Sequence, residues 1–328
     1  MRVIIYICKI FQILTFMLTR RLIRVKVFKE LFGKVVQGTD SLMQAEKELI
    51  LSCSKTVDLY CFLLGLPSAL KKTAEMKIEA GLKKFHPTAQ EANPNRKFVD
   101  NQFIAILEED SAFAHHCAKK GLVWGEYDSF VKKLYASVIS KEYFKEYMES
   151  GANTLEEDLK LVKTIFEEEL EENELLEDIL EEMSIYWMDD LAYTINVILK
   201  NLPIIAKKAK VDVPNIFLKE DDREYALKLL TKSIVNYDEY TELVSSMVSN
   251  WDLERLVATD LALIVMGVTE AVTFESIPLK VTINEFVDIS KYYSTPNSKV
   301  FVNGLLDRIL QQMVKEGKIV KSGRGLVE

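Results

Sequence analysis

Three arginines near the start of a predicted helix are the residues of this sequence best suited to bind a polyanion. Arg20, Arg21 and Arg24 crowd the first two turns of a helix expected over residues 19–36. Guanidinium groups pair with phosphates and base edges through forked N–H donors. The positive end of the helix dipole makes each cation here unfavourable by about 0.3–1 kcal/mol. Because a local rule broken in this way often marks a functional site, the pattern favours nucleic-acid binding.

The sequence offers little for catalysis or metal binding. Three histidines leave few acid–base candidates, and no Ser/His/Asp or Cys/His arrangement stands out. His115, His116 and Cys117 are consecutive, so on a helix they point in different directions and make a poor metal site. The four cysteines show no CxxC spacing and are typical of reduced, buried residues in a cytoplasmic protein. We therefore expect no enzyme, no metal and no cofactor.

Charge is unevenly distributed along the chain. Residues 1–40 hold eight Lys or Arg against two acidic residues, a net charge of +6. The whole chain carries −8, so the other 288 residues sum to −14. A basic end on an acidic body suggests a local site for a polyanion on a surface that otherwise repels nucleic acid.

Residues 1–18 form an apolar leader. Lys9 and Gln12 interrupt it, which leaves it shorter than the roughly 20 apolar residues that span a bilayer. No small-residue cleavage site follows. The simplest interpretation is a start codon assigned too early, with translation beginning at Met17; a membrane anchor is the alternative.

The remaining chain is predicted to be all-α. Gly and Pro number only 19 in 328 residues, and helical periodicity recurs throughout. In the first helix, Thr19 is a candidate N-cap and Gly38 ends the element. Its apolar stripe repeats every four residues: Ile23, Val27, Leu31 and Val35.

The periodicity and breaks suggest a domain plan. After the leader (1–18) and a basic helix (19–38) come a helical insert (41–215), a C-terminal helical domain (216–316) and a basic tail (317–328). Pro203 and Pro214 bracket an expected linker over 201–220. The acidic stretch from Glu156 to Glu182 keeps helical spacing of apolar residues, so we expect a solvated acidic face on a packed helix pair.

The C-terminal third carries specific motifs. WDLER at Trp251–Arg255 is followed by Asp260, Glu270, IPLKVTINEF at Ile277–Phe286 and KYYSTPNSKVFVNGLLDRIL at Lys291–Leu310. This order closely resembles the NusB family, and so does the Arg-Arg-x-x-Arg opening of the first helix. The resemblance covers about residues 19–37 and 222–314.

The resemblance implies an all-helical protein built as two small bundles. Members of the family bind the single-stranded boxA element of nascent RNA, usually with NusE, which is also a small-subunit ribosomal protein. The complex joins elongating RNA polymerase and suppresses premature termination, notably on ribosomal RNA operons. By resemblance, this chain is expected to be a cytoplasmic transcription antitermination factor with no membrane partner.

The resemblance also assigns roles to residues. The three arginines match the RNA-contacting arginines of the family, and Asp260 matches an acidic position near the NusE and RNA surface. Phe301 matches an aromatic that would stack on an unpaired base, with a core aromatic as the alternative. Lys299 beside it would pair with phosphate. For Asn284 and Asn303 we expect buried hydrogen bonds to loop backbone, with contact to RNA as the alternative.

Some residues depart from the family pattern. Leu261 and Val265 replace two arginines, and Thr269 stands where an aromatic is common, which puts the NusE contact in doubt. One alternative is therefore a helical interaction scaffold that has lost RNA binding. A second, an RNA methyltransferase with a NusB-like module, would need a Gly-rich cofactor loop and a nucleophilic Pro-Cys, and the sequence has neither.

Overall fold

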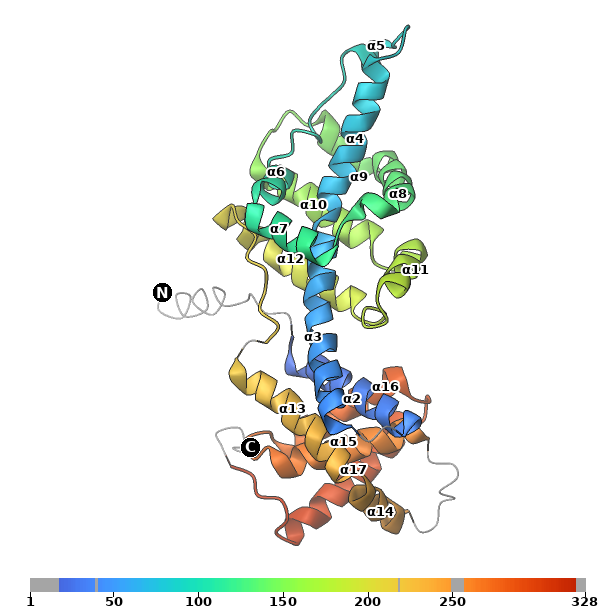
Figure 1. Cartoon of the computed structure of the whole chain (residues 1–328), viewed down its shortest axis with the longest axis vertical. Coiled ribbons are helices and arrows are strands. Elements are labelled where there is room, and N and C mark those ends of the chain that lie inside the picture. The colour runs from blue at the N-terminus through green and yellow to red at the C-terminus, as the bar shows by residue number, and fades with distance from the viewer. Residues whose placement is uncertain (1–17, 39–40, 218, 249–256, 323–328) are drawn as a thin grey trace. The chain divides into compact units, whose positions relative to one another are not determined.

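The computed structural model describes residues 18–38, 41–217, 219–248 and 257–322, and these form helices joined by turns, with no strand among them (Figure 1). The all-α prediction is confirmed. The chain divides into two compact units, and the division falls inside helix α3 (Leu42–Leu64). Unit 1 contains Ser54–Ile216, and unit 2 contains Leu18–Cys53 and Phe217–Glu328. Nearly all of the leader, the WDLER motif and the end of the basic tail lie outside the described residues.

Unit 2 is organised around one buried helix, α15 (Ala258–Thr273). Every residue from Ala262 to Ala271 is buried, and all of them except Thr269 and Glu270 are apolar, as expected for a central helix. Around it pack α2 (Arg20–Gln37), α13 (Glu220–Val235), α14 (Tyr237–Met247), α16 (Leu279–Tyr293) and α17 (Ser298–Lys315).

Helix α2 forms as its sequence predicts. The Thr19 side chain accepts a hydrogen bond from the amide of Leu22 at 3.4 Å, and Gly38 ends the helix in the left-handed conformation, with φ of 63°. Ile23, Val27 and Leu31 are fully buried, whereas Val35, the fourth residue of the predicted stripe, is 37% exposed. This stripe fixes the helix against the unit and sets where its arginines lie.

The first half of α3 belongs to unit 2, although the sequence placed it in the insert. Ala45, Leu49 and Cys53 are buried. The hydroxyl of Thr231 donates to the Glu46 carboxylate at 2.7 Å, and Lys26 Nζ donates to Ser52 Oγ at 3.4 Å. An apolar stripe and two polar contacts therefore hold these residues to α2 and α13.

Unit 1 is a helical assembly with an aromatic core. Phe62 of α3 stacks on Trp124 with ring centroids 4.0 Å apart, and the Trp124 indole N–H donates to the Phe62 carbonyl at 2.8 Å. The remaining elements are α4 (Leu66–Leu82), α5 (Ala89–Ala92), α6 (Gln102–Glu109), α7 (Ser111–Lys120), η2 (Trp124–Tyr127), α8 (Asp128–Ser140), α9 (Glu142–Glu149), α10 (Leu155–Glu169), α11 (Glu174–Met183) and α12 (Leu191–Lys208).

The expected linker over 201–220 is wrong at its start. Pro203 lies inside α12, which continues to Lys208. A proline inside a helix gives up one backbone hydrogen bond. Here Leu202 and Ile205, on either side of it, are buried, so packing of the helix offsets that loss.

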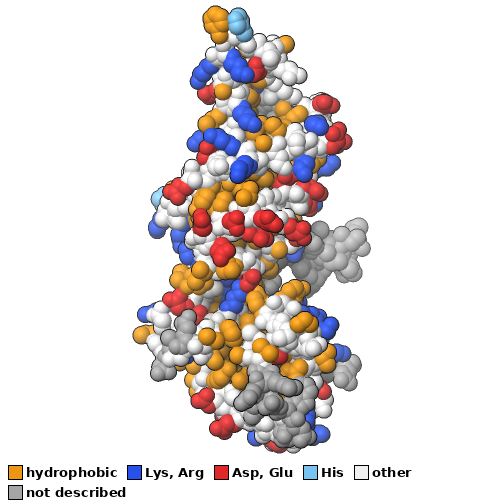
Figure 2. Space-filling view, turned by 90° about the vertical axis from the view of Figure 1, so that its right-hand side faces the viewer, with side chains coloured by type: hydrophobic (Ala, Val, Ile, Leu, Met, Phe, Trp, Pro, Cys, Tyr) orange, Lys and Arg blue, Asp and Glu red, His pale blue; other side chains and the backbone are white. Residues whose placement is uncertain are grey.

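The acidic stretch has the expected two-sided character. Helix α10 buries Leu161, Val162 and Ile165, and α11 buries Leu176 and Leu180. Most acidic side chains of these helices face solvent, and Figure 2 shows Asp and Glu gathered in a band across this face of unit 1. The apolar sides hold the helices in place, and the acidic sides form surface.

One described stretch, Leu42–Leu82, is long and apolar enough to cross a membrane by length and composition alone. Within its most apolar window, 72% is buried inside the protein. The core helix of a folded protein meets the same criteria, and the burial of this stretch is typical of such a helix.

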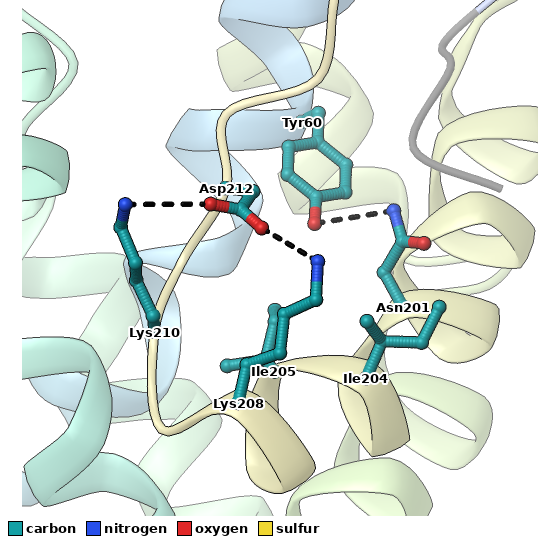
Figure 3. Close-up of a pocket in the computed structure, with 7 residues that line it drawn as sticks. All are labelled: Tyr60, Asn201, Ile204, Ile205, Lys208, Lys210 and Asp212. Atoms are coloured by element: carbon teal, nitrogen blue, oxygen red, sulfur yellow. Dashed lines mark hydrogen bonds and ion pairs between the residues drawn. The ribbon is translucent and has the colours of Figure 1, made fainter. Parts of the chain in front are cut away.

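A small pocket in unit 1 lies between the end of α12 and α3 (Figure 3). Asn201 donates to the Tyr60 hydroxyl at 3.4 Å, and Asp212 pairs with Lys208 at 2.8 Å and Lys210 at 3.6 Å. Its volume of about 10 Å³ is about the least that holds one water molecule. This space is too small for a small-molecule ligand. The Asp212 carboxylate already neutralises one of the two lysine ammonium groups.

Candidate nucleic-acid interface

Two of the three arginines lie at the surface of unit 2. Arg20 Nε is 3.0 Å from the Asp222 carboxylate, and Arg21 Nη1 is 3.3 Å from that of Asp288. Their side chains are 43% and 50% exposed. These pairs offset the unfavourable position of cations at a helix start and leave N–H donors facing solvent.

Arg24 is buried, with 4% of its side chain exposed. Its Nε and Nη2 donate to the two Glu270 carboxylate oxygens at 2.6 and 3.2 Å, and its Nη1 lies 3.5 Å from Glu285. A two-pronged ion pair of this kind is strong and directional. The sequence predicted that Arg24 contacts RNA, but this geometry gives it no surface on which to do so.

Glu270 is the centre of a buried polar cluster. Besides Arg24, it accepts hydrogen bonds from the hydroxyls of Tyr225 and, at 2.7 Å, Thr282. Burial, and then the Glu270 charge, raise the pKa of Tyr225 well above its usual value, so its hydroxyl stays protonated and donates. We call Arg24, Tyr225, Glu270 and Thr282 the Glu270 cluster. It joins α2, α13, α15 and α16, and it was missed from the sequence.

Asp260 is also buried, at 4% exposure. Its two carboxylate oxygens accept hydrogen bonds from the hydroxyls of Ser294 at 2.6 Å and Ser298 at 2.8 Å. Ser294 follows the last residue of α16, and Ser298 begins α17. Asp260 therefore fixes the turn between these helices and offers no charge to a partner at the surface.

The turn fixed by Asp260 leads directly into Lys299 and Phe301. Lys299 is exposed and makes no ion pair with the described residues, and Phe301 is half-buried. Both lie in the first turn of α17, where backbone N–H groups and the helix dipole favour anions. This turn combines a cation, an aromatic ring and a favourable dipole.

Helix α16 connects this turn to the arginines. Asp288 pairs with Arg21 and, at 2.5 Å, with Lys291. Tyr293, at the end of the helix, packs against Phe28 of α2 at 5.5 Å between ring centroids. Tyr292 beside it is 78% exposed. Cations and aromatic rings thus follow one helix from the start of α2 to the start of α17.

We call this region the α2–α16 surface. Its members are the exposed or half-exposed residues Arg20, Arg21, Lys291, Tyr292, Lys299 and Phe301. Interleaved cations and aromatic rings are the side chains that bind single-stranded nucleic acid. Four of its members, Arg20, Arg21, Lys299 and Phe301, belong to the predicted set, and Lys291 and Tyr292 of α16 are additions to it.

Asn284 and Asn303 are not buried, so the prediction that they are is wrong. Each lies within a regular helix, α16 or α17, whose backbone groups bond to one another. The asparagine side chains are therefore not needed as hydrogen-bond partners for loop backbone groups.

The departures from the family pattern have a structural basis. Val265 and Thr269 are fully buried in α15, and the Thr269 hydroxyl donates to the Val265 carbonyl at 2.8 Å. Leu261 is half-buried. Val265 and Thr269 therefore belong to the core, and with Leu261 at the third position these three residues supply no cation on α15.

Comparisons with known proteins agree with this architecture. The NusB family model matches residues 204–311. Three similar relatives are each named transcription antitermination protein NusB. The one from Salinibacter ruber is 39% identical over 124 residues, which cover 37% of this chain and 76% of the relative. The one from Chloroherpeton thalassium is 34% identical over 106 residues, covering 32% and 50%.

The third, from Methylacidiphilum infernorum, is 37% identical over 94 residues, covering 29% of this chain and 66% of the relative. No solved structure matches the chain significantly. The matched part contains the Glu270 cluster residues other than Arg24, together with Asp260 and the start of α17. With most of the Salinibacter relative covered at this identity, the chain belongs to the NusB family.

Proposed function

We propose that this protein is a non-catalytic transcription antitermination factor that binds a boxA-like single strand of nascent RNA through the α2–α16 surface. Acting with NusE and elongating RNA polymerase, it would suppress premature termination. The observation that carries the proposal is the run of Lys291, Tyr292 and Lys299 along α16 and into α17, beside Arg21 of α2, which pairs with Asp288 of α16. The chain that carries it has a net charge of −8. A basic, aromatic strip on an acidic protein confines RNA to one place.

The proposed roles differ among the predicted residues. Arg20, Arg21 and Lys299 pair with phosphates, and Phe301 stacks on an unpaired base. Arg24 has a positioning role, because its buried ion pair with Glu270 fixes the helix that carries the other two arginines. Asp260 likewise holds the turn that presents Lys299 and Phe301.

A polarisation titration of the full chain with a labelled boxA-like single strand tests the proposal. The double variant Arg21→Ala/Lys299→Ala should weaken binding by about tenfold or more. It should also reduce the log–log salt slope by about 0.7 for each phosphate that is no longer neutralised. The matched control is Lys119→Ala/Lys133→Ala, which removes two exposed lysines of unit 1. Unchanged RNA affinity in the first variant defeats the proposal, and retention of NusE by a chain that binds no RNA would favour the scaffold instead.

A further inference from the structure

We propose that α11 and the segment that follows it form a docking surface for a basic, amphipathic segment of another protein. This α11 surface is defined by Leu175, Asp178, Glu181, Glu182, Ile185 and Met188. It lies in unit 1, outside the region that resembles NusB proteins, and it is independent of RNA binding.

The charge of this region is unusually one-sided. Residues 164–199 contain twelve Asp or Glu and no Lys or Arg. The seven acidic side chains from Glu171 to Glu182 are all exposed, and within the described part of the chain none forms an ion pair. Elsewhere in unit 1, exposed carboxylates commonly pair with a neighbouring lysine, as Asp128 does with Lys132. Within the described chain, the acidic residues of α11 are therefore not paired with a cation.

The acidic residues also occupy an unfavourable end of their helix. Glu181 and Glu182 lie in the last turn of α11, which has no basic residue. The helix dipole is negative there, so each carboxylate costs about 0.3–1 kcal/mol. A cationic partner would remove this cost, and a cost left uncompensated within the fold is typical of a surface used for binding.

Apolar side chains share this surface. Leu175, Asp178 and Glu182 follow the spacing of one helix face. Leu175 is 47% exposed, and beyond the helix end Ile185 and Met188 are 71% and 56% exposed. Figure 2 shows hydrophobic side chains lying beside the acidic band on this side of unit 1. A surface of this composition binds through both burial of apolar area and charge.

The segment that carries Ile185 and Met188 is held in place by its neighbours. The Trp187 ring is 2% exposed and stacks 5.8 Å from Phe62, and its indole N–H donates to the Lys55 carbonyl at 2.7 Å. Asp190 is buried and accepts a hydrogen bond from Thr56 at 2.6 Å. Because Trp187 and Asp190 point inward, the residues between and before them are presented outward in a defined position.

Charge complementarity indicates which kind of partner binds the α11 surface. Nucleic acid is repelled by a surface without cations, and the net charge of −8 opposes association with a second copy of this chain. A helix with Lys or Arg around a row of apolar residues satisfies both components of the surface. We therefore assign a basic amphipathic protein segment.

The test is a polarisation titration of the full chain with a labelled amphipathic helical peptide of Lys and Leu. A second peptide has the same composition with its leucines scattered around the helix. The first should bind about tenfold or more tightly than the second. Ile185→Ser/Met188→Ser and Asp178→Asn/Glu181→Gln/Glu182→Gln should each abolish that preference. The matched control, Glu146→Gln/Glu149→Gln/Glu156→Gln, removes three carboxylates elsewhere in unit 1 and should preserve it.

Equal binding of the two peptides, or an equal loss in the control variant, would show general charge attraction and overturn the proposal. A dimer in sedimentation that the Ile185→Ser/Met188→Ser variant dissociates would also overturn it, because the occupant would then be a second copy. Circular dichroism melting confirms that each variant is folded, which the exposure of the substituted side chains leads us to expect.

Discussion

The start of α2 and the end of α11 break the same electrostatic rule in opposite senses. Helix α2 places three arginines at its positive end, and α11 places two glutamates at its negative end. In α2 the fold supplies the missing partners: Asp222, Asp288 and Glu270 each pair with one arginine. In α11 no described cation pairs with the glutamates. The comparison shows that partners within the fold must be identified before a charge at the unfavourable end of a helix is taken as a sign of a binding site.

The largest effect is expected where the pairing is buried. Glu270→Ala leaves the Arg24 guanidinium in the core without its partner, so it should lower the free energy of unfolding by about 3–5 kcal/mol. Urea denaturation followed by circular dichroism measures the change. Glu285→Ala removes a longer ion pair, at 3.5 Å, from a side chain that is 24% exposed, and should cost far less. Similar losses in the two variants would contradict a special role for Glu270.

A smaller effect is expected at Asp260. Asp260→Ala removes the acceptor of two serine hydroxyls and should cost about 1–3 kcal/mol of unfolding free energy. Because the turn then loosens, RNA affinity should also fall, although Asp260 itself is buried. Asp260→Asn keeps one acceptor oxygen and should lose about half as much stability. If stability falls while RNA affinity is unchanged, Asp260 does not position Lys299 and Phe301.

A third carboxylate, that of Glu30, should make the stability of the protein depend on pH. Burial first, and then the neighbouring Glu48 charge, raise the pKa of Glu30 to about 7. The folded state therefore holds this proton more tightly than the unfolded chain does, and the resulting stability is lost as pH rises from about 4.5 to about 7. Glu30→Gln should flatten the stability curve in this range, with a modest effect because Glu30 is only half-buried. Thermal melts across this pH range test the prediction. A stability curve that Glu30→Gln leaves unchanged would contradict the assignment of this pH dependence to Glu30.

The smallest effect is expected on α11. Glu181→Gln/Glu182→Gln removes two charges from the negative helix end and should raise the unfolding free energy by a few tenths to about 1 kcal/mol. By contrast, Arg21→Gln in α2 should bring no gain, because Asp288 loses its partner. Chemical denaturation of both variants sharpens the comparison. A loss of stability in the α11 variant would mean that its glutamates have partners within the fold.

Local sequence patterns predicted much of unit 2. The Thr19 cap and the stripe of Ile23, Val27 and Leu31 depend on neighbours along the chain. The partner of Arg24 does not, because Glu270 is 246 positions away. The three arginines therefore looked equivalent, whereas packing buried one and exposed two.

Other errors have the same origin. Pro203 signals a break locally, but burial of Leu202 and Ile205 carries α12 past it. Asn284 and Asn303 suggested loop contacts, but they lie in regular helices and are not buried. The family resemblance placed Asp260 at a partner surface, and its serine partners, 34 and 38 positions away, could not be foreseen from the sequence. Interactions between residues distant in sequence decide which polar residues support the site and which remain available to a ligand.

The most direct test of RNA binding is to locate the RNA on the protein. A boxA-like strand carrying 4-thiouridine is photo-crosslinked to the full chain, and the crosslinked peptides are identified by mass spectrometry. The α2–α16 surface predicts crosslinks at peptides containing Tyr292 and Phe301, and none at the peptide that spans Glu171 to Glu182. Crosslinks confined to unit 1, with none on α16 or α17, would contradict it.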